Sequence, residues 1–172
     1  MLAESKLLVA RSAAEERGQQ KWLELCGVIT LLASIKLKED DFEAAESLYK
    51  ESLALHEKHQ RPDEAEVAGA EQNLGYLYIR MGRPNDAEPL YRKSVEAYEA
   101  RIADTSEPAP REAYGRHLAL GYFALAQIAR SGQRLPESQD SCKKALFYAE
   151  LWSDSGNRKV ITTSCEALLQ SH

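Results

Sequence analysis

Three alanines recur at a fixed interval in this chain. Ala3, Ala45 and Ala87 follow one another at 42-residue spacing, and each opens a related segment that begins Ala-Glu. A fixed period of this size indicates a stack of similar structural units. Stacked units expose a long surface and do not enclose a reaction site, so we expect a binding protein and not an enzyme.

Apolar residues recur at helical spacing almost throughout the chain. One example is the series Ala45, Leu48, Tyr49, Ser52 and Leu53, at i, i+3, i+4, i+7 and i+8. Strand-like alternation is absent. Glycine, proline and polar clusters divide the chain into seven or eight antiparallel helices, with breaks at Gly18, Arg61-Pro62, Gly82 to Pro84, Pro108 to Pro110, Gly132 with Pro136, and Ser153 to Gly156.

Composition limits the partners of such a protein. The net charge of −5 argues against nucleic-acid binding, which needs clustered Lys and Arg side chains. No window approaches the roughly 20 apolar residues of a membrane span, and the amino terminus lacks a signal-peptide pattern, so we expect a cytoplasmic protein without a membrane partner. Cys26, Cys142 and Cys165 are widely spaced and have no zinc-site pattern, which favours reduced thiols used as small apolar residues.

A second motif accompanies the period. Leu74, Gly75 and Tyr78 precede the glycine break at Gly82, and Ala87 and Tyr91 follow it. Leu-Gly-x-x-Tyr followed by Ala and an aromatic residue resembles the tetratricopeptide repeat, although ordinary members repeat every 34 residues. The longer 42-residue unit is similar to the kinesin-light-chain type. The resemblance implies an all-α fold, a right-handed superhelix of helix-turn-helix repeats.

The repeat register predicts the domain organisation. We expect a single array with helix B of a partial repeat over residues 1–18, three repeats over 20–60, 63–103 and 109–152, and a capping helix over 157–172. The third repeat is out of step, because Ser138 aligns with Ala87 after 51 residues. The nine extra residues are expected between Tyr98 and Gly115.

The resemblance also implies a binding site, because the first helix of each pair lines the inner face of the family's concave groove. The implied peptide-binding residues are Thr30, Ser34, Lys38, Gln72, Asn73, Tyr76, Arg80, Phe123, Gln127 and Arg130. An amide such as Asn73 can pair with both the N–H and C=O groups of a peptide backbone. Tyr76 and Phe123 could hold an apolar anchor.

Three of these residues are cations at corresponding places in the repeats. A line formed by Lys38, Arg80 and Arg130 would attract an acidic peptide, and the resemblance favours this interpretation because kinesin-light-chain grooves are basic. Each cation also lies near a helix C-terminus, where the helix dipole favours positive charge without any ligand. The sequence leaves both interpretations open.

Other chemistry-bearing clusters have simpler explanations. His56 and His59 have no further metal ligand nearby, and we expect them at a solvated helix end. The acidic run Glu39-Asp40-Asp41 lies at a helix start, where carboxylates pair with free N–H groups. We therefore predict no catalytic residues, no metal and no cofactor.

These observations lead to one main hypothesis and two alternatives. The main hypothesis is a scaffold or adaptor that binds a peptide segment of a protein partner, of acidic character, in its concave groove. The first alternative is a self-assembly module that forms homo-oligomers through its array ends. The second is a regulatory sensor domain of a larger protein.

Overall fold

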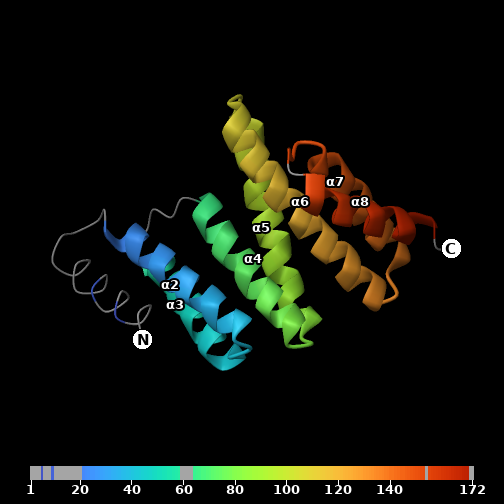
Figure 1. The fold of residues 1–172 in the computed structure, drawn as a ribbon. Coiled ribbons are helices and arrows are strands. Elements are labelled where there is room, and N and C mark those ends of the chain that lie inside the picture. Colours follow the sequence, from blue (N-terminus) through green and yellow to red (C-terminus); the bar gives the residue numbers. More distant parts are fainter. Residues whose placement is uncertain (1–4, 6–8, 10–20, 59–63, 154, 171–172) are drawn as a thin grey trace. The chain divides into compact units, whose positions relative to one another are not determined.

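The computed structural model of the 172-residue chain describes residues 5, 9, 21–58, 64–153 and 155–170 (Figure 1). Within these residues all regular structure is helical, which confirms the predicted all-α class. The helices are α2 (Lys21–Lys38), α3 (Phe42–Lys58), α4 (Glu64–Arg80), α5 (Pro84–Asp104), α6 (Pro108–Ser131), α7 (Leu135–Ala149) and α8 (Ser155–Gln170). The helix expected over residues 1–18 lies outside the described residues, apart from Ser5 and Val9.

The chain divides into two compact units, Met1–Arg83 and Pro84–His172. In the first unit, α3 packs against both α2 and α4. In the second unit, α6 packs against α5 and α7, and α8 packs mainly against α7. Each unit is therefore built from helices that pack against their neighbours in sequence, as repeat proteins are.

The residues that carry the repeat pattern lie in the core. The buried positions are Ala45 and Tyr49 on α3, Ala87 and Tyr91 on α5, and Ser138 and Cys142 on α7. A small side chain lets two helices approach closely, and a larger one a turn later fills the space beside that contact. All three cysteines are buried, as expected for thiols used as small apolar residues.

The helix starts follow local chemistry. Asp41 precedes α3, and its Oδ1 accepts a hydrogen bond from the Ala44 backbone N–H at 3.3 Å, as an N-cap residue does. Helices α5 and α6 each begin at a proline, Pro84 and Pro108. Proline suits the first helical position because its missing N–H would have no partner there.

Three helix ends share one backbone geometry. Asp40, Gly82 and Gln133 have positive φ angles of 57°, 71° and 59°, respectively. The next residue in each turn donates its backbone N–H to a carbonyl five residues earlier: Asp41 to Lys36 at 3.0 Å, Arg83 to Tyr78 at 2.8 Å, and Arg134 to Ala129 at 2.8 Å. This is the Schellman arrangement that ends a helix. The three turns are separated by 42 and 51 residues, so they carry the same register as the sequence repeat.

The extra residues of the third repeat lie in helices and not in a loop. Helix α5 has 21 residues and α6 has 24, whereas α3 and α4 have 17 each. Only residues 105–107 separate α5 from α6. The insertion therefore lengthens an antiparallel helix pair at the end that carries Gly115.

Candidate peptide-binding surface

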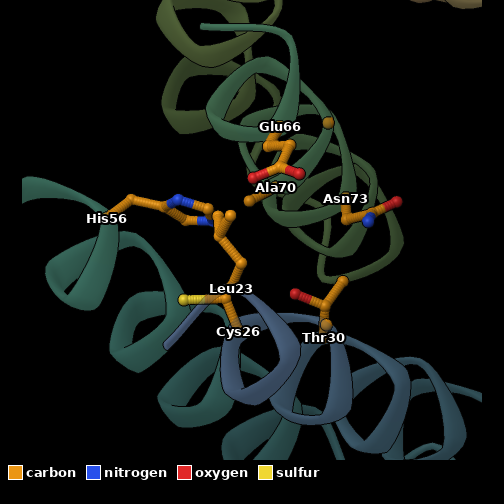
Figure 2. Close-up of a pocket in the computed structure, with 9 residues that line it drawn as sticks. Leu23, Cys26, Thr30, His56, Glu66, Ala70 and Asn73 are labelled. Atoms are coloured by element: carbon orange, nitrogen blue, oxygen red, sulfur yellow. The ribbon is translucent and has the colours of Figure 1, made fainter. Parts of the chain in front are cut away.

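Helices α2 and α4 border a cavity of about 260 Å³ in the first unit (Figure 2). Its lining comes from α2 (Leu23, Cys26, Gly27 and Thr30), from the end of α3 (His56), and from α4 (Glu66, Gly69, Ala70 and Asn73). Residues 23–30 of α2 thus lie opposite residues 66–73 of α4. Beyond the end of α2, Asp40 bonds Arg80 at the end of α4. The two helices therefore run side by side in the same direction.

One face of α4 carries a polar side chain every seven residues. Glu66, Asn73 and Arg80 are each two helical turns apart, so they lie in one row along the helix. Tyr76 lies between Asn73 and Arg80 in this row and is 48 % exposed. The row begins with an acid, has an amide at its middle and ends with a cation.

The predicted residues of α2 are held against α3. The Thr30 hydroxyl lies 3.1 Å from the Ser52 hydroxyl, although Thr30 also lines the cavity. The Ser34 hydroxyl donates to the Thr30 carbonyl at 3.0 Å and lies 3.0 Å from the Tyr49 hydroxyl. Hydrogen bonds within the helix pair thus already engage both hydroxyl groups.

The predicted residues of α4 differ in accessibility. Gln72 is buried, with 7 % of its surface exposed, which makes it the least accessible of them to a peptide. Asn73 is half-buried and lines the cavity. The Asn73 amide has no hydrogen-bond partner among the described residues. Asn73 therefore offers donors and an acceptor to a ligand.

The cation Arg80 is paired within the first unit. Its Nη2 donates to Asp40 Oδ1 at 2.7 Å, and its guanidinium lies 5.7 Å from the centre of the Phe42 ring. Tyr76 and then Asp40 raise the pKa of Arg80. Lys38 is exposed at the end of α2. Asp40 thus pairs with Arg80, a role that its place in the acidic run did not predict, while Asp41 caps the helix.

The remaining predicted residues lie on α6, in the second unit. Phe123 and Arg130 are half-buried, and Gln127 is exposed. Their spacing of four and three residues places them on one face of α6. Each unit therefore presents its own set of predicted groove residues.

His56 is a site residue that the sequence analysis placed wrongly. We expected it at a solvated helix end, but only 4 % of its surface is exposed, and it lines the cavity. Its ring meets the buried Trp22 edge-on, with 5.4 Å between ring centroids and an 86° angle between planes. Burial lowers the pKa of His56. The missed signal was its position seven residues after Tyr49, on the same buried face of α3.

Cys26 and Glu66 are the other lining residues outside the predicted set. The Cys26 thiol faces the Ser52 carbonyl at 3.9 Å, and burial raises the pKa of this thiol to about 11. The thiol is therefore protonated at neutral pH and forms part of the apolar wall. Glu66 is exposed and brings a carboxylate to the lining.

A second cavity of about 260 Å³ lies in the second unit, between α5, α6 and α7. Its polar groups bind one another. Tyr122 donates its hydroxyl proton to Glu99 at 2.7 Å, and Lys144 Nζ donates to the Tyr122 oxygen at 3.2 Å while lying 4.8 Å from the ring centre. These internal bonds make this cavity a weaker candidate than the first.

Two further structural findings bear on function. Among the described residues, no helix is long and apolar enough to cross a membrane. The same part of the chain contains no group of three or more His, Cys, Asp or Glu side chains placed to hold a metal ion.

The comparisons with known proteins agree with this architecture. Residues 25–100 match the tetratricopeptide repeat family model. No curated protein matches the chain. The crystal structure of BtubC (BKLC) from P. vanneervenii is similar in fold, with a TM-score of 0.54 at 19 % identity over 96 % of this chain and 80 % of that one.

The match to this family indicates a general role for the fold. Tetratricopeptide repeats are scaffolds for protein–protein interaction and are typically not enzymes. Residues 25–100 of this chain are therefore similar to the tetratricopeptide repeat family.

Proposed function

We propose that the surface shared by α2 and α4 binds an extended peptide segment of a protein partner. Asn73 carries this proposal. Asn73 lines the cavity, and its amide has no hydrogen-bond partner among the described residues. One amide can accept from a peptide N–H and donate to a peptide C=O, which holds an extended chain irrespective of its sequence.

The polar row on α4 sets the length of the segment. Glu66 and Arg80 are 14 residues apart, which corresponds to about 21 Å along a helix. An extended peptide rises about 3.3 Å per residue, so about six residues span the row. A short linear segment is therefore the proposed ligand.

The charges along this row favour one orientation of the bound peptide. Lys38 and Arg80 lie at the C-terminal ends of α2 and α4, and Glu66 lies about 20 Å away at the other end of the row. A segment with acidic residues beside Lys38 and Arg80, and without them beside Glu66, would match this pattern. The bond from Arg80 to Asp40 joins two exposed side chains, so exchanging Asp40 for a ligand carboxylate costs little.

Peptide titration tests the proposal. Two pools of synthetic peptides would be titrated against the full chain by fluorescence anisotropy. Each peptide has about twelve residues, which is twice the number that spans the row. One pool carries acidic residues in one half, and the other has serine in their place. We expect the acidic pool to bind more tightly and the double variant Asn73→Ala with Arg80→Glu to weaken its binding at least about tenfold.

The control is Lys143→Glu, which changes net charge as Arg80→Glu does but lies exposed on α7. It should leave peptide affinity within about twofold of the wild type at 0.15 M salt. Unchanged affinity in the double variant would reject the assignment of the surface. Sedimentation of the unliganded chain over a range of concentrations tests the self-assembly alternative, which requires an increase in mass.

A further inference from the structure

The cavity of the second unit lies between two helices, α5 and α7, whose side chains meet at both of its ends. At one end, Arg92 of α5 bonds Glu137 of α7. Further along both helices, Glu99 of α5 accepts a hydrogen bond from the Tyr148 hydroxyl of α7 at 3.2 Å. The two helices therefore run in the same direction, and the residues between these two bonds form opposite walls of the cavity.

Three polar side chains in the middle of these walls take no part in the bonds across the cavity. Glu96 lies on the α5 wall, between Arg92 and Glu99, and Asp140 and Ser141 lie on the α7 wall. None of the three has a hydrogen bond or an ion pair with another described residue. The cavity therefore has acceptor groups on two opposite walls that a ligand can use.

Ser141 is the most enclosed of these three groups. It is only 9 % exposed, yet its hydroxyl has no partner among the described residues. This hydroxyl is also not one of the completely enclosed unpartnered atoms in that part of the chain, so it keeps access to the cavity that Ser141 lines. A largely buried hydroxyl without a partner costs free energy, so a ligand that bonds it gains affinity.

The charge of the lining favours a cationic ligand. Four carboxylates line the cavity, against the two cationic side chains of Arg92 and Lys144. Arg92 is bound by other carboxylates, and Lys144 donates to the Tyr122 oxygen at 3.2 Å. The excess negative charge therefore stays at Glu96 and Asp140, where a cation between the two walls would be attracted to both.

The cavity also offers apolar contact and enough room for a side chain. Val95 of α5 and Leu125 of α6 line it, and both are buried. A cavity of about 150 Å³ holds a benzene molecule, so about 260 Å³ accommodates a planar charged group and part of its stem. A side chain with methylene groups and a charged head matches this lining.

We propose that this cavity binds the guanidinium group of an arginine side chain that a protein partner presents. A guanidinium is planar and has five N–H donors that point outward in its plane, so it can bond Glu96 on one wall and Asp140 and Ser141 on the other. A lysine ammonium is a compact, strongly hydrated charge and fits acceptors on two walls less well. The site goes beyond the proposed function, since it uses no residue of α2 or α4.

Titration with small probes, followed by two-dimensional ¹H–¹⁵N NMR of the full chain, tests the proposal. The probes are N-acetyl-arginine N-methylamide and its lysine and citrulline counterparts; citrulline has nearly the shape of arginine but no charge. At 0.15 M salt we expect the arginine probe to shift amide signals of residues 92–99 and 137–144, with a dissociation constant on the order of a few millimolar. The lysine probe should bind about threefold more weakly or less, and the citrulline probe at least about tenfold more weakly.

Protein variants locate the contact. Glu96→Gln with Asp140→Asn keeps the shape of the lining and removes both charges, so it should weaken binding of the arginine probe at least about tenfold. Ser141→Ala should weaken it about threefold or more. The control, Glu150→Gln with Glu166→Gln, removes the same charge from exposed positions outside the lining and should leave the affinity within about twofold of the wild type.

Each contrary result has a definite meaning. Absence of any shift with the arginine probe, equal binding of the citrulline probe, or unchanged affinity in the double variant of Glu96 and Asp140 would overturn the proposal. An equal loss in the control would show that net charge alone attracts the probe, and would overturn it as well. Equal affinity for the lysine probe would reject the guanidinium as the preferred group. All these results leave the proposed peptide surface of α2 and α4 standing, because the two sites share no residue.

Discussion

Arg134 donates two parallel hydrogen bonds to Glu88, from Nη1 to Oε1 at 2.9 Å and from Nη2 to Oε2 at 2.6 Å. The equivalent residues of the first unit, Arg83 and Glu46, are joined by a longer hydrogen bond, from Nη1 to Oε2 at 3.2 Å. Each arginine follows a positive-φ turn residue, and each glutamate follows a repeat alanine, Ala45 or Ala87. The pairs therefore link the second helix of one repeat to the turn of the next.

The Arg134–Glu88 pair, with its shorter hydrogen bonds, should stabilise its unit more than the Arg83–Glu46 pair does. Arg134, and after it Arg92, lower the pKa of Glu88 to about 2, and the Glu88 side chain is only 19 % exposed. We predict that Arg134→Ala lowers the free energy of unfolding by about 1–3 kcal/mol, and that Arg83→Ala lowers it by about 1 kcal/mol or less. Urea unfolding followed by circular dichroism measures both, with the exposed Lys143→Ala as control. Equal losses for the two arginine variants would contradict the prediction.

At the positive-φ turn positions, glycine should make the protein more stable than other residues do. Gln133 has a φ of 59° where the preceding repeat has Gly82 at 71°. Because a side chain at such φ values costs free energy that glycine avoids, Gln133→Gly should raise stability by about 0.5–1 kcal/mol. Gln127→Gly makes the same replacement inside α6 and should lower stability by about 1 kcal/mol. A fall in melting temperature for Gln133→Gly would count against the turn geometry.

Replacing either of two helical glycines by alanine should change the stability of the protein, but in opposite directions. A Cβ atom at Gly115 would lie 2.9 Å from Leu151 Cβ, whereas one at Gly27 would meet nothing within 4 Å. Gly115→Ala should therefore lower the free energy of unfolding by about 1–3 kcal/mol through overpacking. Gly27→Ala should raise it by up to about 1 kcal/mol, because alanine favours the helix more than glycine does. Thermal unfolding of the pair measures both changes, and a shift of the same sign in both would refute this assignment.

Stability should fall in mildly acidic solution because of His117. This ring stacks on Tyr98, with 4.7 Å between centroids, and burial together with Arg116 lowers the pKa of His117 from 6.5 to about 4. The unfolded chain then binds a proton that the folded chain does not, so stability present above pH 6.5 is lost as the pH falls toward 4, by up to roughly 3 kcal/mol.

His117→Phe keeps the ring and removes this titration, so its stability should depend less on pH between 6.5 and 4 than that of the wild type. Urea unfolding at several pH values provides the comparison. Burial of His56 acts in the same direction, and it remains in the variant as a shared background. A titration of His117 by NMR with a midpoint near 6.5 would contradict the structural assignment.

Much of the fold could be predicted because its signals are local. The glycine and proline breaks at Gly82 to Pro84 and at Pro108 stop or start a helix through backbone geometry alone, and α4, α5 and α6 end or begin there. The buried pattern of Ala45 and Tyr49 likewise follows from helical periodicity. The sequence could not show that the nine extra residues extend α5 and α6, because both a longer helix pair and a longer loop preserve the register.

The candidate site was harder to predict because side-chain partners come from other helices. Ser34 falls in the family's groove register, yet its hydroxyl binds the Thr30 carbonyl and meets Tyr49 of α3. His56 lies near a helix end, where exposure is the usual expectation, but Trp22 from α2 covers it. The pairing of Asp40 with Arg80 joins residues 40 positions apart and has no local signature.

The amino-acid sequence by itself determined the all-helical class, the repeat register and the residues of the helix pairs that are buried, because periodicity and backbone breakers act over a few residues. Only the tertiary structure decided which polar groups are engaged and which remain available. Packing of α2, α3 and α4 occupies the hydroxyl groups of Thr30 and Ser34, buries His56, and leaves Asn73 in the lining of a cavity. Which atoms meet across that cavity depends on how each helix is rotated against its neighbours, and no single segment of sequence encodes that rotation.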